Sequence, residues 1–360
     1  MASSRRTFFQ KSALTGTALS LFGASSANGA RPHAVPTTRA TALMELFGLR
    51  YPIFMGPYGG SLLASAVSNA GAMGSITLWT STPDAAYQSV TNLRRQTTRP
   101  FVANYVLAFE PVSLPKALEA GVPVVGFSWG LPGKTVVTTV RNARAKFGVQ
   151  VGTAEGARRA LDLGADYLVC QGSEAGGHVQ SSTPLYEILP RIVDAAKEIP
   201  VLAAGGISNG QKIRKALLNG AAGVVIGTRF VATQESLAHE EYKKAIIQAS
   251  AKDTALSICF QDGWPGAAHR TLRNGTLNHW ETDGCPPVGK RPGEGDIVAS
   301  GPGGAKIIRY SITPPRKSFE GVVTDLAMYA GQGVDDVKDL PKAHNLIERL
   351  WAECLDERRT

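Results

Sequence analysis

A lone histidine, His178, follows two adjacent glycines in the stretch QGSEAGGH at residues 171–178. A histidine exchanges protons near neutral pH, so a histidine at the mouth of a strand is a candidate acid or base. Gly176 and Gly177 let the main chain approach a flat or anionic ligand closely, because no Cβ intervenes. The stretch therefore predicts a ligand-binding loop that carries a catalytic imidazole.

Two side chains of this loop also have structural interpretations. His178 could bond to a neighbouring carbonyl and take no part in chemistry. Glu174 fits better as an acceptor for loop amides than as a catalytic acid, because a carboxylate inside a loop needs hydrogen-bond donors. We keep both interpretations open for His178.

Glycines also end two later apolar runs, in AAGGI at residues 203–207 and VIGT at residues 225–228. A segment with helical spacing follows each run. Main-chain N–H groups at such strand ends and helix N-termini bind phosphate. The implied ligand has a phosphate over these two strands and a body that reaches the first and sixth strands. Flavin mononucleotide (FMN) has that shape.

Short apolar runs alternate with helical segments along most of the chain, which predicts an α/β fold. The candidate strands are residues 52–57, 74–78, 101–106, 122–127, 149–152, 167–170, 201–204 and 223–227. Helices are expected over 154–163 and 185–197, with Thr153 and either Ser208 or Asn209 as N-caps. Eight such units predict a (β/α)8 TIM barrel, whose active site lies at the C-terminal strand ends. An open doubly wound sheet is the alternative, but no GxGxxG follows the first strand.

Composition divides the chain into segments. The barrel is expected over 43–252, and a Gly- and Pro-rich cap over 253–318 covers its mouth. Closing helices are expected over 319–333 and 341–355, within a final segment 319–355 that packs on the barrel.

The first thirty residues resemble a bacterial twin-arginine export signal. Arg5 and Arg6 precede a weakly apolar run, and small residues suit cleavage near residue 27 or 30. The apolar run is too short for a membrane span. The twin-arginine translocation machinery carries folded proteins, so we expect a periplasmic protein that binds its cofactor before export.

The totals exclude several classes of protein. The net charge of +9 comes from scattered Lys and Arg residues without interleaved aromatics, so no nucleic-acid partner is expected. The four cysteines form no CxxC pair and no zinc spacing, so no metal site is expected. Cys170 fits a core position, and Cys259 with Cys285 is the one disulfide pair considered.

The motif at residues 171–178 is similar to the QGxEAGGH signature of the nitronate monooxygenase family, formerly called 2-nitropropane dioxygenases. AAGGI, IGTRF at 226–230 and YAGQG at 329–333 resemble its later motifs in the same order. The resemblance runs from about Leu43 to about Leu350.

This resemblance implies an FMN enzyme that oxidises alkyl nitronates with O2 to a carbonyl compound and nitrite. His178 would be the base or hydrogen-bond partner at the flavin face. The implied FMN contacts are Met55, Gly56, Asn104, Gln171, Gly172, Gly176, Gly177, Gly205, Gly206, Val225, Ile226, Gly227, Thr228 and Gln332. Asn104 could instead be an ordinary polar group at a strand end, and Gln332 could cap a turn.

One position departs from the family pattern. Many members carry a second histidine in SFHFG, where this chain has GFSWG at residues 126–130, so Ser128 replaces that histidine. Serine is a poor base without assistance and carries no charge. An already ionised nitronate could still react, because its carbon needs no deprotonation. Trp129 could stack on a planar substrate or simply pack.

Two other functions remain open from the sequence. An NAD(P)H-dependent flavin reductase of quinones or enoyl thioesters could use the same barrel. A periplasmic flavin-binding or partner-binding protein without catalysis is the third hypothesis.

Overall fold

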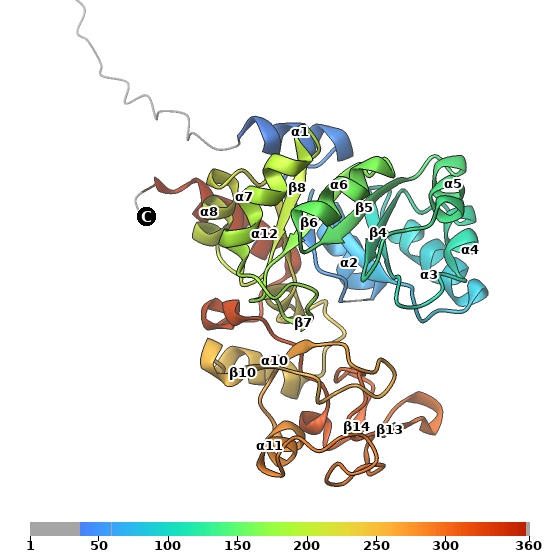
Figure 1. The fold of residues 1–360 in the computed structure, drawn as a ribbon, viewed down its shortest axis with the longest axis vertical. Coiled ribbons are helices and arrows are strands. Elements are labelled where there is room, and N and C mark those ends of the chain that lie inside the picture. Colours follow the sequence, from blue (N-terminus) through green and yellow to red (C-terminus); the bar gives the residue numbers. More distant parts are fainter. Residues whose placement is uncertain (1–36, 59, 358–360) are drawn as a thin grey trace, which may run out of the picture. The chain divides into compact units, whose positions relative to one another are not determined.

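The computed structural model describes residues 37–58 and 60–357, which belong to one compact unit. The expected export signal at residues 1–30 lies outside the described residues. Eight parallel strands and the helices between them form the upper part of the unit in Figure 1, and a smaller region of mixed structure lies below. None of the described helices has the length and apolar character needed to cross a membrane.

The parallel sheet confirms the predicted (β/α)8 barrel. Its strands are β1 (Ile53–Met55), β2 (Gly74–Thr77), β3 (Phe101–Val106), β4 (Val124–Ser128), β5 (Lys146–Val151), β6 (Tyr167–Gln171), β8 (Val201–Ala204) and β9 (Gly223–Ile226). They are ordered β1-β9-β8-β6-β5-β4-β3-β2. A parallel bridge between Phe54 and Met73 closes the ring between β1 and β2, and Met55 N donates to Met73 O at 2.8 Å.

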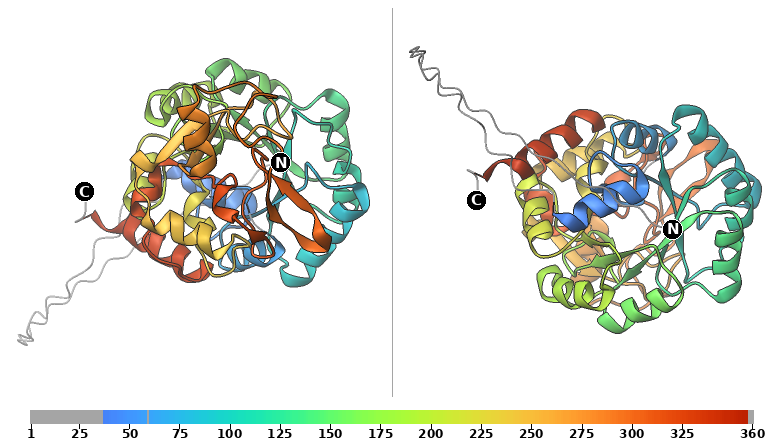
Figure 2. Two further views of the ribbon diagram at one scale, coloured as in Figure 1. Left: turned by 90° about the horizontal axis from the view of Figure 1, so that it is seen from below. Right: turned by 90° about the horizontal axis from the view of Figure 1, so that it is seen from above.

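Most helices surround the strands, as both views of Figure 2 show, and the helix at residues 38–47 lies across the ring in the right-hand view. They are α1 (Thr38–Phe47), α2 (Ser61–Asn69), α3 (Pro83–Gln96), α4 (Leu114–Glu119), α5 (Lys134–Asn142), α6 (Ala154–Asp162), α7 (Leu185–Ala196), α8 (Gly210–Leu218), α9 (Thr228–Val231) and α12 (Ala343–Leu355). The predicted N-caps are confirmed at two helices. The Thr153 side chain accepts from Gly156 N before α6, and the Asn209 side chain accepts from Lys212 N before α8. Each cap satisfies a main-chain donor that the helix itself leaves free.

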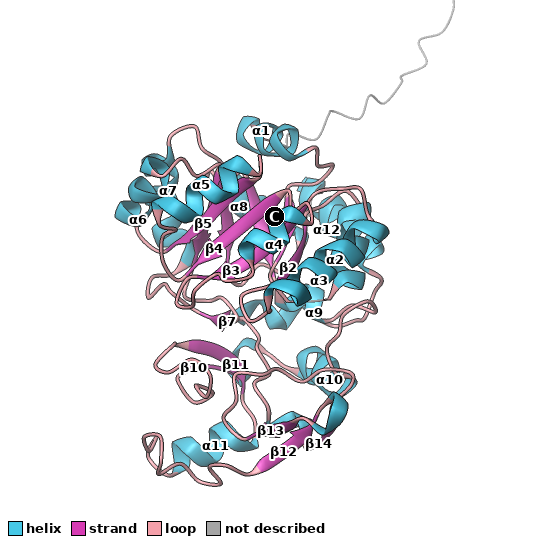
Figure 3. Ribbon diagram, turned by 90° about the vertical axis from the view of Figure 1, so that its right-hand side faces the viewer, coloured by secondary structure: helices cyan, strands magenta, loops and turns pink. Residues whose placement is uncertain are grey.

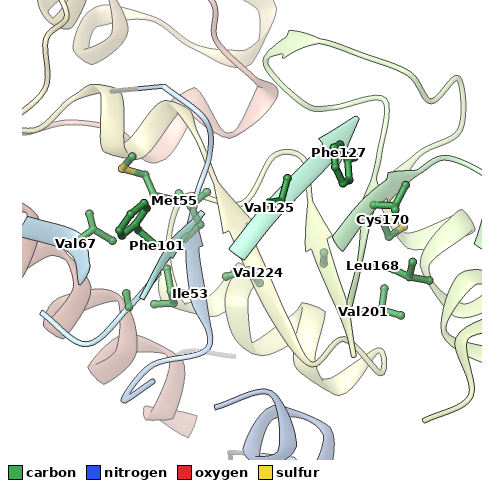
Figure 4. Packing of buried hydrophobic residues seen from close by; sticks show 14 of the residues in the cluster. Ile53, Met55, Val67, Phe101, Val125, Phe127, Leu168, Cys170, Val201 and Val224 are labelled. Atoms are coloured by element: carbon green, nitrogen blue, oxygen red, sulfur yellow. The ribbon is translucent and has the colours of Figure 1, made fainter. Parts of the chain in front are cut away.

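Alternating strand residues build two cores, because successive side chains point to opposite faces of a strand. One set packs between strands and helices; Ile53, Val125, Leu168, Cys170 and Val201 of this cluster are among the residues in Figure 4. The other set belongs to a second cluster, which includes Phe54, Val102, Tyr167 and Leu202 and also Leu43 and Phe47 of α1. Cys170 is therefore a buried core residue, as predicted.

A cap follows the last barrel strand (Figure 3). Its elements are α10 (Glu240–Gln248), β10 (Thr254–Ser257), β11 (His269–Leu272), α11 (Gly275–Thr282), β12 (Ile297–Ser300), β13 (Lys306–Ile308) and β14 (Glu320–Gly321). One cap sheet has the order β10-β11-β7, and β7 (Gly177–His178) comes from the loop after β6. The cap is thus joined to the barrel by main-chain pairing at the predicted histidine.

Two segments differ from the sequence-based expectation. α10 lies in the expected barrel segment 43–252, yet it packs with Leu272 and Met328 in one hydrophobic cluster. The helix expected over 319–333 is wrong. That segment holds β14 and a short 3-10 turn at Val323–Asp325 instead. Gly321 has φ of 112°, a value that a helix does not accept.

Candidate functional site

A cavity of about 860 Å³ opens at the C-terminal ends of the barrel strands, and cap residues complete its wall. Its size suits a cofactor-sized ligand, because such pockets usually measure roughly 300–1,000 Å³. Most of the predicted site residues line it: Met55, Gly56, Asn104, Ser128, Gln171, Gly176, Gly177, His178, Gly205, Gly206, Val225, Gly227 and Thr228. The structure therefore brings together residues from six of the eight barrel strands or the loops after them.

Strand register explains the floor of this cavity. Asn104 pairs with Gly126, Gly126 with Gly148, and Gly148 with Tyr167, so these four residues form one layer. A Cβ at Gly148 would overlap the ring of Tyr167. The two glycines therefore make room for the Tyr167 ring inside the barrel, so Asn104 and the Tyr167 hydroxyl are the polar side-chain groups of this layer.

The next layer along β4 contains Ser128, two residues beyond Gly126. The alternation of strand side chains places it on the inner face, and only 7% of its surface is exposed. Val106 of β3 pairs with Ser128 and also lines the cavity. Ser128 thus occupies the inward position at which the family pattern has a histidine.

Three predicted site residues, Gly172, Ile226 and Gln332, do not line the cavity. Ile226 is fully buried in the cluster between strands and helices, since its neighbour Val225 takes the inward place. Gly172 lies behind the loop, where a Cβ would clash with Leu185 at 2.5 Å. Gln332 is exposed, and its main-chain N donates to Glu174 O at 3.0 Å.

Glycines on consecutive strand ends lie at one corner of the cavity, where an anion-binding site is expected. Gly205 and Gly206 have φ of 123° and 67°, which few other residues adopt. The N–H groups of Gly205, Gly206 and Gly227 donate to no other residue within the described ranges. A Cβ at Gly227 would meet no atom within 4 Å, so this corner is open. Free main-chain donors at such a corner match the needs of a phosphate.

Gln171 fixes the loop that carries the histidine. Its Nε2 donates to His178 O at 3.1 Å, and its Oε1 accepts from Gln180 N at 2.8 Å. The side-chain amide thereby bonds the loop as a neighbouring strand would. Gln171 consequently serves the site in two ways, since it also lines the cavity.

His178 is held among aromatic rings at the cavity wall. Its ring stacks on Trp264 with centroids 4.2 Å apart, and Tyr329 lies at 5.5 Å. Burial, and secondarily the nearby His269, lowers the pKa of His178 to about 3. The imidazole is therefore neutral near pH 7, and its buried Nε2 has no hydrogen-bond partner among the described residues. Because this nitrogen bonds to no carbonyl of the described residues, it gives no support to the interpretation of His178 as a carbonyl-bonded structural histidine.

His269 is a site-supporting residue that sequence reasoning missed. It lies opposite His178 in the pairing of β11 with β7. Its Nε2 accepts from Phe260 N at 3.0 Å, and its Nδ1 bonds to Ala267 O at 2.9 Å. Both ring nitrogens are used by the neutral form, and burial lowers the pKa of His269 to about 4. Its nearness to His178 arises from long-range pairing, for which the sequence gives no local signal.

Glu174 has the structural role expected for it. Its carboxylate oxygens accept from Leu185 N at 3.1 and 3.0 Å, at the N-terminus of α7. A negative charge there satisfies a free donor and the helix dipole. Glu174 is absent from the cavity lining, so it orders the loop without reaching a ligand.

The cavity is almost uncharged. Arg316 is the one Asp, Glu, Lys or Arg among the described residues that line it. No described group of three His, Cys, Asp or Glu side chains could hold a metal. Cys259 and Cys285 are free thiols, the first buried and the second exposed. An anionic ligand in this cavity would therefore not be repelled by a carboxylate of the described lining.

The donor set and the space fit a phosphate-bearing planar cofactor. Free N–H groups at Gly205, Gly206 and Gly227 would hold the phosphate. Asn104, Gln171 and His178 would lie along the ring system, because all three line the same cavity. These side chains can bond to a heteroaromatic edge, and none of them carries a charge that a flavin would oppose.

Comparisons with known proteins identify the family to which this chain belongs. A family model described as nitronate monooxygenase matches residues 40–116 and 109–353. The chain is 32% identical to the probable nitronate monooxygenase of Bacillus subtilis (strain 168), over 86% of this chain and 98% of the relative.

Two further proteins are similar over much of their length. One, from Mycobacterium tuberculosis, is named (3aS,4S,5R,7aS)-5-hydroxy-7a-methyl-1-oxo-octahydro-1H-indene-4-carboxyl-CoA dehydrogenase and is 34% identical over 67% of this chain and 68% of its own length. The nitroalkane oxidase structure from Streptomyces ansochromogenes aligns with a TM-score of 0.71 and 28% identity, covering 88% of this chain and 99% of that one. Since the family model covers most of the sequence, the chain belongs to the nitronate monooxygenase family, a family of flavin enzymes.

Proposed function

We propose that the protein is an FMN-dependent oxidoreductase that oxidises alkyl nitronates with O2 to a carbonyl compound and nitrite. The observation that carries the proposal is the shared cavity. His178 and the glycine corner of Gly205, Gly206 and Gly227 line one space, and they lie in stretches that resemble the family's motifs, within the residues that the family model matches.

FMN would lie with its phosphate at the glycine corner and its ring toward Asn104 and His178. When bound, FMN supplies the redox chemistry, because it accepts electrons from the nitronate and passes them to O2. The protein binds and orients the cofactor and keeps bulk water from the reacting carbon. Thr228 supports the corner, since its Oγ1 accepts from Gly331 N at 3.0 Å.

His178 would act as a neutral base or hydrogen-bond partner next to the substrate. A low pKa makes it a weak base, so its main use is with a nitronate that is already ionised. Ser128 can donate a hydrogen bond to a nitronate oxygen, but it offers no positive charge. We therefore expect turnover of preformed nitronates and little turnover of neutral nitroalkanes.

An absorbance spectrum of the purified mature protein tests the cofactor, and aerobic addition of propyl-2-nitronate tests the reaction. We expect a flavin spectrum, oxygen uptake and release of nitrite. A colourless protein that FMN does not reconstitute would contradict the cofactor, and a yellow protein that consumes no oxygen with nitronate would contradict the reaction.

A second candidate is an NAD(P)H-dependent flavin reductase of quinones or enoyl thioesters. Two observations favour it: Ser128 at the position of the family's second histidine, and a relative named as a carboxyl-CoA dehydrogenase. Anaerobic mixing with NADH or NADPH separates the two functions. Prompt bleaching of the flavin supports the reductase, and an unchanged spectrum supports nitronate oxidation.

We also propose that the protein reaches the periplasm through the twin-arginine translocation machinery. Arg5 and Arg6 at the head of the apolar run support this proposal. Replacing both with lysine in the full-length chain should keep the protein in the cytoplasmic fraction. Unchanged periplasmic recovery of that variant would refute the export route.

A further inference from the structure

Three tryptophans line the cavity beside His178, and each comes from a different part of the fold. Trp79 follows β2, Trp129 follows β4, and Trp264 belongs to the cap. Trp264 lies 4.8 Å from Trp129 and 5.8 Å from Trp79, between ring centroids. We call Trp79, Trp129 and Trp264 the tryptophan wall. Because Trp264 also stacks on His178, the wall adjoins the proposed reaction centre.

The conformation of Trp129 is unusual and is held by a specific contact. Its φ is 58°, in the left-handed region that residues other than glycine rarely adopt. Gln180 Oε1 accepts from Trp129 N at 3.0 Å and from Gln150 Nε2 at 2.6 Å. Strained main chain persists where its surroundings enforce it, and such residues gather at ligand sites. The contact with Gln180 thereby holds the Trp129 ring at the end of β4, in the stretch where the family pattern has SFHFG.

The indole N–H groups of the tryptophan wall are free. The cap residue Trp280 shows the usual arrangement, because its Nε1 donates to Pro286 O at 2.9 Å. Within residues 37–58 and 60–357, no atom accepts a hydrogen bond from the indole of Trp79, Trp129 or Trp264. Their Nε1 atoms are not among the buried unpartnered atoms, and Trp79 and Trp129 are half-buried, so these donors are open to the cavity, where a ligand can supply acceptors.

The cavity offers few charged side chains that could bind a substrate. His178 and Tyr329 are titratable groups near the wall, and among the described residues Arg316 is the one Asp, Glu, Lys or Arg in the lining. Contact with the rings must therefore supply much of the binding. Flat rings contact indoles best in offset or edge-to-face arrangements, which gain more than burial alone.

We propose that the protein selects nitronates whose reacting carbon bears an aromatic ring, and that the tryptophan wall binds this ring. The inference rests on the proposed function and names the substrate class of the same cavity. The ring would lie against Trp129 and Trp264, and the nitronate oxygens would accept from Ser128 and the free indole N–H groups. The carbon next to the ring would then face His178.

Steady-state kinetics on the holoenzyme test this selectivity with two preformed nitronates. We expect kcat/KM for phenylmethanenitronate to exceed that for ethylnitronate by at least about tenfold. Trp129→Leu and Trp79→Leu should each lower this ratio by at least about fivefold. Trp351→Phe is the matched control, because Trp351 lies on α12 against Tyr51 and does not line the cavity. A ratio near one, or one that the wall variants leave unchanged, overturns the proposal.

Equilibrium binding separates this inference from the proposed function. Phenylacetate and propionate match the two nitronates in shape and charge but do not react, and calorimetry on the protein as purified measures their affinities. If nitronates are not oxidised, the proposed function fails. The tryptophan wall is then still supported when phenylacetate binds at least about tenfold more tightly than propionate and Trp129→Leu removes the difference. Equal affinities overturn it whether or not nitronates react.

Discussion

A substitution of His178 tests its proposed role in catalysis. Replacing it with asparagine keeps a hydrogen-bonding side chain of similar size but removes the basic nitrogen. We expect His178→Asn to retain FMN and to lower turnover of nitronate at least about tenfold. Flavin absorbance per protein measures retention, and oxygen uptake measures turnover. Unchanged turnover would remove His178 from the mechanism.

The two buried histidines also make stability depend on pH. Their pKa values lie at about 3 and about 4 in the folded protein, below the ordinary value of 6.5. The unfolded chain therefore binds more protons in this range, and stability falls as the pH drops from 6.5 toward 3. We expect Tm to fall between about pH 7 and about pH 5, and to fall less in His178→Asn, which has lost one such group. Parallel Tm profiles for both proteins would contradict the assignment.

Sequence motifs identified the chemistry of single residues better than the direction in which their side chains point. QGSEAGGH correctly singled out His178 as a cavity residue and Glu174 as a structural acceptor. The same motifs also pointed to Ile226 and Gln332, which do not line the cavity, because a motif does not say which face of a strand or turn a side chain occupies. Trp264 and His269 were missed as neighbours of His178, since only the fold brings them there.

At the level of elements, the N-terminus of α7 is capped by the carboxylate of Glu174, which lies outside the helix. Glu174→Gln keeps the size of the side chain but weakens the charge-assisted bonds to Leu185 N. We expect a loss of about 1 kcal/mol in the free energy of unfolding, measured by urea denaturation. Glu155→Gln, in the first turn of α6, is the exposed control and should change stability by less. An equal loss in both variants would show that Glu174 has no special role.

Strands were predicted more reliably than the connections after them. The bounds of β3 and β8 match the prediction, because each is a short apolar run between turn residues. The segment 319–333 was misjudged because its apolar residues resemble a helix in spacing. Its glycines instead serve close main-chain contacts, such as Gly331 against Gly176, which depend on residues distant in sequence.

At the level of the whole molecule, the histidine loop and the late glycine segment meet without room for side chains. A Cβ at Gly176 would overlap the main chain of Gly331, and a Cβ at Gly331 would lie 2.8 Å from Gly176 N. We expect Gly176→Ala to separate the two segments, weaken FMN binding and lower turnover. The measurements are the FMN dissociation constant and kcat.

Gly133→Ala is the control for this substitution. Its φ is −66° and a Cβ there meets nothing within 4 Å, so alanine fits without strain. Gly133→Ala should match the wild type in both measurements. Wild-type cofactor affinity in Gly176→Ala would show that the two segments can separate without cost.

The barrel could be read from periodicity, and the cap could be recognised only as a change in composition. Its contribution to the site could not be read, because β11 reaches β7 through antiparallel pairing across a long sequence distance. Arg270 strengthens this junction, since its Nη2 donates to Ser173 O at 3.0 Å. Neither contact leaves a pattern in the local sequence.

The pairing of β7 with β11 also limits how such proteins can be recombined. The strand that carries His178 is hydrogen-bonded to the region that supplies Trp264, so the proposed base and part of the proposed tryptophan wall depend on one junction. A chimera that exchanges residues 254–329 for those of a relative would therefore need the histidine loop from the same donor. A transfer of substrate selectivity between members of the family would therefore require both segments, which are encoded by distant parts of the gene, to be exchanged together.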